Sequence, residues 1–92
     1  MSTRDAVLEP LRGKGRTVRG ALTEVAERWV TARLDDADVG ALEDAVRHLL
    51  RRGVICRELP AGIDAEALAR VFVRGLQAGQ GTAALEAILP GR

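Results

Sequence analysis

The sequence predicts an all-α bundle of four to five helices, with at most one short strand near residues 54–59. Three observations favour this class. Apolar residues recur at helical spacing through most of the chain, helix-capping residues precede several of these stretches, and only one stretch has a strand-like composition. A chain of 92 residues corresponds to a single helical domain over residues 1–92.

The composition excludes several classes of protein. Hydrophobic residues make up 47% of the chain and charged residues 29%, which is typical of a globular protein rather than a disordered one. One Cys and one His leave no set of residues for an intramolecular disulfide, a Cys-based zinc site or a histidine-rich metal centre. No apolar run reaches the roughly 20 residues of a membrane span. We therefore expect a cytoplasmic protein that contacts no membrane, and the preference for Arg over Lys suggests a bacterial or phage source.

Two helices are expected in the first third of the chain. The first carries Val7, Leu8 and Leu11 on one face, and Pro10 limits it because an internal proline removes a backbone hydrogen bond. The second helix is capped by Thr17. Its apolar residues follow a helical stripe: Val18, Ala21, Leu22, Val25, Ala26, Trp29 and Val30.

A third helix follows the acidic turn Asp35–Asp38. Acids at its start and arginines at its end complement the helix dipole, and Gly53 stands where a glycine commonly ends a helix. The stretch 54–59, closed by Pro60, is expected either to pair as a strand with another chain or to be an extended connector. The apolar face of this helix consists of Val39, Leu42, Val46, Leu49 and Leu50.

Two more helices are expected near the C-terminus. Asp64 caps the fourth helix, and Thr82 caps a short fifth helix that Pro90 stops. Gly75 on the fourth helix indicates a close approach of another helix, from this chain or from a second copy. The buried face of the fourth helix is predicted to be Leu68, Val71, Phe72, Gly75 and Leu76, and that of the fifth is Leu85, Ile88 and Leu89.

The residues that bear chemistry favour structural roles. His48 and Cys56 are eight positions apart, and Asp44 lies one turn before His48, so we expect a surface ion pair and a half-buried thiol rather than a nucleophilic pair. Asp35–Asp38 are explained by helix capping rather than by a cation site. Gly13–Thr17 lacks the spacing of a phosphate loop and is expected to be a solvated basic loop. We expect no enzyme activity, no cofactor and no metal.

Charge is segregated along the chain although the net charge is only +1. Residues 34–46 carry five acids and no base, whereas residues 47–57 carry four arginines and no acid. Basic side chains in such a cluster are what phosphate contacts require, but a solvated helix end is the favoured interpretation. The candidate contacts to a polyanion or a peptide are Arg16, Arg47, Arg51, Arg52 and Arg57.

One pattern covers residues 42–77. Gly53–Leu59 is followed by Ile63–Arg70 and then by Gly75 on the fourth helix. This arrangement resembles the C-terminal regulatory domain of TetR-type repressors, in which a helix ends at a glycine, a short connector follows, and an Asp-capped helix leads into the dimerisation region. The resemblance implies helix packing and dimerisation but not operator binding, because the DNA-binding helices of that family have no counterpart here.

A second pattern covers residues 15–57. Gly15–Val18 leads into the second helix, Asp38–Val39 opens the third, and Leu49–Ile55 leaves it. This arrangement resembles a winged-helix unit and is similar to the helical half of PqqD-like peptide-recognition domains. The resemblance implies binding of DNA or of a peptide.

These observations favour a non-catalytic protein-interaction or regulatory module. We expect self-association through the fourth and fifth helices, so that the partner is a second copy in a homodimer or another protein. The alternative is a winged-helix-like binder of DNA or of a peptide that uses the Arg cluster, with nucleic acid the less favoured ligand. The residues expected at the interaction surface are Leu68, Val71, Phe72, Gly75 and Leu76.

Overall fold

The computed structural model describes residues 3–12, 17–31 and 34–89. These residues form five helices and no strand, which confirms the predicted all-α class. None of the described helices is long and apolar enough to cross a membrane. The helices are α1 (Thr3–Arg12), α2 (Val18–Trp29), α3 (Asp36–Ile55), α4 (Ala65–Gln77) and α5 (Gly81–Ile88).

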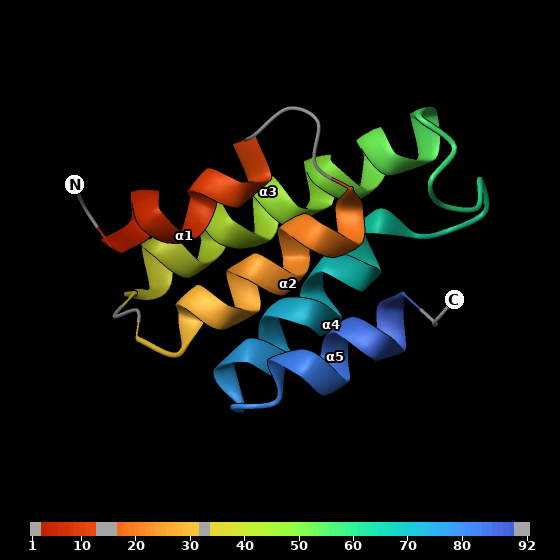
Figure 1. The fold of residues 1–92 in the computed structure, drawn as a ribbon. Coiled ribbons are helices and arrows are strands. Elements are labelled where there is room, and N and C mark those ends of the chain that lie inside the picture. Colours follow the sequence, from red (N-terminus) through yellow and green to blue (C-terminus); the bar gives the residue numbers. More distant parts are fainter. Residues whose placement is uncertain (1–2, 13–16, 32–33, 90–92) are drawn as a thin grey trace.

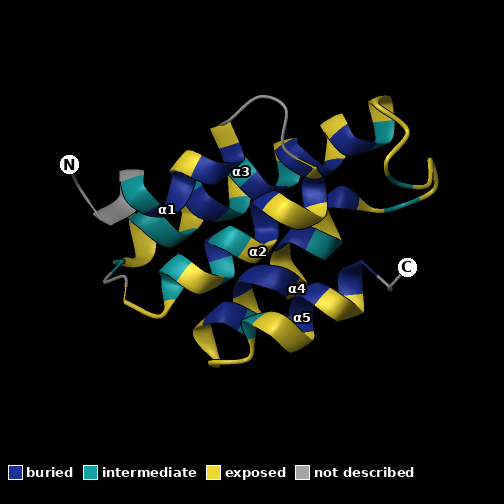
Figure 2. Ribbon diagram, in the orientation of Figure 1, coloured by how far each residue is buried: buried dark blue, intermediate teal, exposed yellow. Residues whose placement is uncertain are grey.

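The five helices pack into one bundle, in which α3 contacts α1, α2 and α4 (Figure 1). Helix α2 contacts α1, α3 and α5, and α4 lies between α3 and α5. The bundle measures 33 × 26 × 21 Å along its principal axes. Each helix turns its buried residues inward and its exposed residues outward, whereas the connection between α3 and α4 is mostly exposed (Figure 2).

The core is aliphatic apart from one ring. Phe72 is fully buried, and no buried residue of the described chain is polar or charged. The stripes predicted for the second and third helices are confirmed in the main, but Ala26, Trp29 and Val39 are half-buried and Val30 is 81% exposed. On α4 the prediction is wrong at Val71, which is 45% exposed, while Val73 is buried instead. Helix α4 is covered on two sides, by α3 and by α5, so its buried arc is wider than a single stripe.

Pro10 does not end α1, which continues to Arg12. A proline cannot donate a hydrogen bond to the carbonyl four residues earlier, which here belongs to Ala6. Arg28 Nη1 on α2 donates to this carbonyl at 2.6 Å and also to Glu9 at 3.0 Å, while Nη2 donates to Glu24 at 2.6 Å. The hydrogen bond with Glu9 contributes most to raising the pKa of Arg28 above its usual value, so the guanidinium stays charged. One side chain therefore joins α1 to α2 and satisfies the carbonyl that the proline leaves unpaired.

Side-chain caps start three of the helices. The N–H of Gly20 donates to Thr17 at 2.9 Å, that of Asp38 to Asp35 at 2.9 Å, and that of Ala67 to Asp64 at 3.2 Å. These bonds satisfy amides that the first turn of a helix leaves free. The capping role predicted for Thr82 is wrong. Helix α5 begins one residue before it, after Gln80, which makes no side-chain cap.

Gly53 does not end α3, and residues 54–59 do not form a strand. Helix α3 continues to Ile55, and Gly53 is a buried residue within it. The N–H of Arg57 donates to the carbonyl of Val54 at 3.1 Å, and that of Glu58 to Gly53 at 2.8 Å. This is the Schellman arrangement, with Arg57 in the left-handed position that glycine normally fills, at φ 66°.

Replacing Arg57 by glycine should stabilise the protein. A side chain in the left-handed conformation costs about 1–2 kcal/mol relative to glycine, and some of this is returned as the greater chain entropy of unfolded glycine. We expect the free energy of unfolding to rise by about 0.5–1 kcal/mol, measured by urea denaturation.

The matched control for this change is at the end of α4. There Gly79, at φ 76°, makes the same pair of hydrogen bonds through its own N–H and that of Gln80. Gly79→Ala should lower the stability by about 1 kcal/mol, although nothing lies within 4 Å of the added carbon. If Arg57→Gly lowered the free energy of unfolding, the inference that Arg57 is strained at this turn would be wrong.

Candidate functional site

An apolar groove of about 600 Å³ lies where the start of α2, the α3–α4 connection, α4 and the end of α5 meet. Buried Val18, Ile88 and Leu89 contribute to its lining together with half-buried side chains that remain in contact with solvent. The half-buried apolar residues are Leu59, Ile63 and Leu68. We call this depression the apolar groove.

Close packing at Gly53 brings the walls of the groove together. A Cβ on this glycine would lie 2.7 Å from Val18 Cγ2 and 3.0 Å from Leu59 Cδ1, so only glycine allows the two side chains to approach α3 this closely. The N–H of Val18 also donates to the Glu58 carboxylate at 3.3 Å. The turn after α3 is thereby tied to the start of α2, 40 residues away.

The polar side chains that line the apolar groove are engaged within the protein. Glu58 accepts from the Val18 N–H, and Asp64 caps α4. Arg19 Nη2 donates to the carbonyl of Leu89, which joins α2 to the end of α5. The apolar groove therefore presents apolar side chains to a ligand, while the charged groups at its rim are already hydrogen-bonded within the protein.

The residues predicted to form an interaction surface divide into two sets. Phe72 and Leu76 are 0% and 2% exposed and pack in the core of their own chain. An added Cβ on Gly75 would lie 2.3 Å from Ala84 Cβ, so the helix that approaches this glycine is α5 of the same chain. The prediction that these three residues lie at an interaction surface is therefore corrected: they pack inside the bundle of their own chain. Only Leu68, in the apolar groove, and Val71, outside it, present side chains to solvent.

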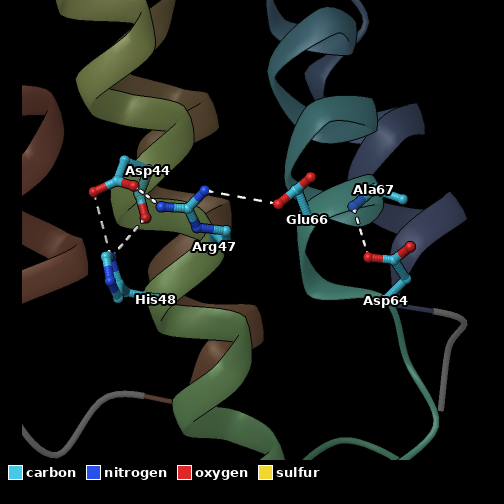
Figure 3. A network of polar contacts seen from close by, with 6 residues as sticks. All are labelled: Asp44, Arg47, His48, Asp64, Glu66 and Ala67. Atoms are coloured by element: carbon cyan, nitrogen blue, oxygen red, sulfur yellow. Dashed lines mark hydrogen bonds and ion pairs between the residues drawn. The ribbon is translucent and has the colours of Figure 1, made fainter.

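The predicted arginine cluster also divides. Arg16 lies outside the described residues. Arg47 pairs with Asp44 on α3 and lies 4.0 Å from Glu66 on α4, and its Nε is buried without a partner (Figure 3). By contrast, Arg51, Arg52 and Arg57 are exposed and form no ion pair within the described part of the chain.

His48 and Cys56 are not brought together. His48 Nδ1 lies 2.9 Å from the carbonyl oxygen of Asp44 and 3.5 Å from its carboxylate, as the sequence predicts (Figure 3). Cys56 is exposed at the end of α3, so the expectation of a half-buried thiol is wrong. Eight residues of helix separate two positions by about 12 Å along the axis, far beyond the reach of a hydrogen bond. This arrangement does not activate the thiol.

The acidic turn before α3 has a capping function. Asp35 caps the helix, and Asp36 and Asp38 lie in its first turn, where carboxylates interact favourably with the helix dipole. Among residues 3–12, 17–31 and 34–89, no group of three or more His, Cys, Asp or Glu side chains is arranged to hold a metal ion. Of the basic loop Gly13–Thr17, only Thr17 is described, and it caps α2.

The apolar groove was not predicted from the sequence. One local signal for it exists, because Leu59 and Ile63 are apolar residues in a connection that is otherwise exposed. Comparison with known proteins adds no relationship, since the chain matches no family model, no curated protein and no solved structure.

Proposed function

We propose that this protein is a non-catalytic protein-interaction module, and that the apolar groove binds an apolar segment of a partner protein. The observation that carries the proposal is the groove itself, about 600 Å³ in volume and lined by aliphatic side chains from four parts of the fold. Leu59, Ile63 and Leu68 pack against the core but stay half-buried there.

The state of the rim favours a protein segment over a polar small molecule. Small-molecule sites combine an apolar wall with a few free polar groups that orient the ligand. Here Arg19, Glu58 and Asp64 are already hydrogen-bonded within the chain. Recognition by shape and apolar burial is what anchor side chains of a docked peptide or helix provide.

Apolar burial supplies enough free energy only if several anchors bind together. One fully buried leucine-sized side chain contributes about 1.5–3 kcal/mol. Micromolar affinity corresponds to about −8 kcal/mol, after the cost of immobilising the segment. We therefore expect the partner segment to carry two or three aliphatic or aromatic residues spaced along the groove.

A library of random peptides of about 12 residues, selected on the immobilised native protein, tests this proposal. We expect enriched peptides to share aliphatic or aromatic anchors. Their affinity for Leu68→Glu should be at least about tenfold weaker, because a carboxylate in the groove must be desolvated when the peptide binds. Fluorescence anisotropy with a labelled peptide measures the affinity.

Val71→Glu is the matched control, since Val71 lies on the same helix but does not line the apolar groove. Both variants are first compared with the native protein by circular dichroism to establish that they fold. If Leu68→Glu loses its structure, Ile63→Glu, another substitution in the lining of the apolar groove, replaces it. No enrichment, or enriched peptides that bind Leu68→Glu as well as they bind the native chain, would overturn the proposal.

The alternative proposal is a binder of DNA or of an anionic peptide through the arginines at the end of α3. It is supported by the exposure of Arg51, Arg52 and Arg57 without ion pairs. It has less support than the apolar groove because Arg47 is already paired and the neighbouring Asp44 and Glu66 repel phosphate. Salt-dependent binding of a generic DNA duplex at low ionic strength would favour it.

A further inference from the structure

The two most exposed large aliphatic side chains of the described residues lie at the ends of different helices. Val30 follows α2 and is 81% exposed, and Ile55 ends α3 and is 80% exposed. Figure 1 shows the end of α3 and the end of α2 at opposite ends of the bundle. A single exposed aliphatic residue is ordinary on a protein surface. What distinguishes these two is the charge around each.

The surface around Ile55 is basic. Arg51 lies one turn before Ile55 on α3, and Arg52 and Arg57 are close to it in the chain. All three arginines are exposed and have no ion pair in the part of the chain that the structure describes. We call Arg51, Arg52, Ile55 and Arg57 the basic surface.

The carboxylates closest in sequence to the basic surface are already engaged. Glu58 accepts from the N–H of Val18, and Asp64 caps α4. Asp44 and Glu66 both face Arg47. Among residues 3–12, 17–31 and 34–89, no ion pair balances the positive charge of the basic surface.

The surface around Val30 is a second groove, and it is acidic. It has a volume of about 1100 Å³ and lies between α2 and the α4–α5 turn. Trp29 and Val30 line it beside Glu27 and Glu86, both of which are exposed and form no ion pair among the described residues. Small residues at the turn leave room for an approaching helix end: Gly79, Gly81 and Ala83. We call this second depression the acidic groove.

One cation lines the acidic groove, but it is held at the far end. Arg19 donates to the carbonyl of Leu89, beyond the end of α5. Glu27 lies one turn before Val30, and Glu86 is on the facing helix α5. Arg19 keeps its charge, so the lining of the acidic groove carries two carboxylates and one guanidinium, a net charge opposite in sign to that of the basic surface.

We propose that copies of this protein associate head to tail, with the basic surface of one copy docked in the acidic groove of the next. Ile55 then lies against Trp29 and Val30, while the arginines of the basic surface pair with Glu27 and Glu86. Because the two surfaces differ, the contact is heterologous and forms chains or closed rings rather than a two-fold dimer. This contact does not use the apolar groove, so the two proposals are tested separately.

Such a contact is weak and salt-dependent. Solvent-exposed ion pairs contribute little, and salt screens them over a Debye length of about 10 Å at 0.1 M. We expect the weight-average mass in sedimentation velocity to exceed twice the 9.8 kDa of one chain at high protein concentration. It should fall toward 9.8 kDa on dilution or when salt is raised to about 0.5 M.

A charge swap identifies the contacting surfaces. The variant R51E/R57E has two acidic surfaces, and the variant E27R/E86R has two basic ones. Each alone should sediment as a monomer at the concentration where the native chain assembles. An equimolar mixture should assemble again, because every contact then joins opposite charges.

The control reverses two other exposed arginines, in the variant R70E/R74E on α4. It changes the net charge as much as R51E/R57E does, but it should assemble like the native chain. A monomeric native protein at all concentrations would overturn the proposal. So would loss of assembly only in R70E/R74E, which would place the contact on α4, or binding of duplex DNA to the basic surface of a chain that does not assemble.

Discussion

Phe72→Ala is expected to bring the protein close to unfolding. Phe72 is fully buried and is the only aromatic ring enclosed in the described core, which is otherwise aliphatic. Removing a buried phenylalanine side chain costs about 3–5 kcal/mol, because the cavity only partly collapses. Domains of this kind have a total stability of about 5–15 kcal/mol. Urea denaturation followed by circular dichroism should show a transition at much lower urea concentration, or no folded baseline.

The neighbouring Val71 is the control for this change. Its side chain is 45% exposed, so Val71→Ala should leave the urea midpoint almost unchanged. The comparison also separates two roles for Phe72. If the ring served an interface between copies, Phe72→Ala would lower the mass in solution and leave the monomer stable. That outcome would contradict the position of Phe72 in the core of its own chain.

Most of the core was predictable because α2 and α3 follow simple helical stripes. Val18, Leu22 and Val25 are buried as their spacing predicts, and so is the predicted face of α3 except for the half-buried Val39. Periodicity fails on α4, where Val73 is buried and Val71 is not. Val73 lies off the predicted stripe, which indicates from the sequence that a second face of this helix is covered, but which helix covers it depends on where the other helices pack.

Glycine was the least predictable residue type. Gly53 follows Arg51 and Arg52 at the apparent end of a helix, which is typical of a terminating glycine. It is instead a contact point for Val18, 35 positions earlier in the chain, and an arginine adopts the left-handed turn. Glycine is suited both to ending a helix and to allowing close packing. Only the position of Val18 in the fold shows that Gly53 has the second role.

The apolar groove was beyond local sequence analysis for the same reason. Its lining comes from four parts of the chain that meet only in the folded bundle. Leu59 and Ile63 are its one local signal, because apolar residues in a short exposed connection indicate packing against another part of the protein. The contact of Arg47 with Glu66 likewise depends on how α3 packs against α4, which no spacing within α3 shows.

Gly75→Ala should destabilise the protein, although the same change inside a helix usually stabilises it. Alanine gains about 1 kcal/mol over glycine in a helix interior. At Gly75 the new Cβ would lie 2.3 Å from Ala84 Cβ and 3.3 Å from the carbonyl oxygen of Gln80. Neither neighbour is the end of a flexible side chain, so α5 must move away from α4. Overpacking of this kind costs about 1–3 kcal/mol, and urea denaturation should show a net loss of stability.

Gly40→Ala is the matched control, because Gly40 is inside α3 with nothing within 4 Å of an added Cβ. This change should stabilise the protein by about 0.5–1 kcal/mol. If Gly75→Ala stabilised the protein to the same extent, the close approach of α4 and α5 would be refuted.

The double variant G75A/A84G tests the contact itself. Ala84→Gly alone should cost about 1 kcal/mol, because it places a glycine inside α5. If the two positions were independent, the double variant would lose the sum of both costs. Because the second change removes the atom that the first one meets, we expect the double variant to be at least as stable as Gly75→Ala alone. Additive losses would mean that the instability of Gly75→Ala arises somewhere other than the contact between α4 and α5.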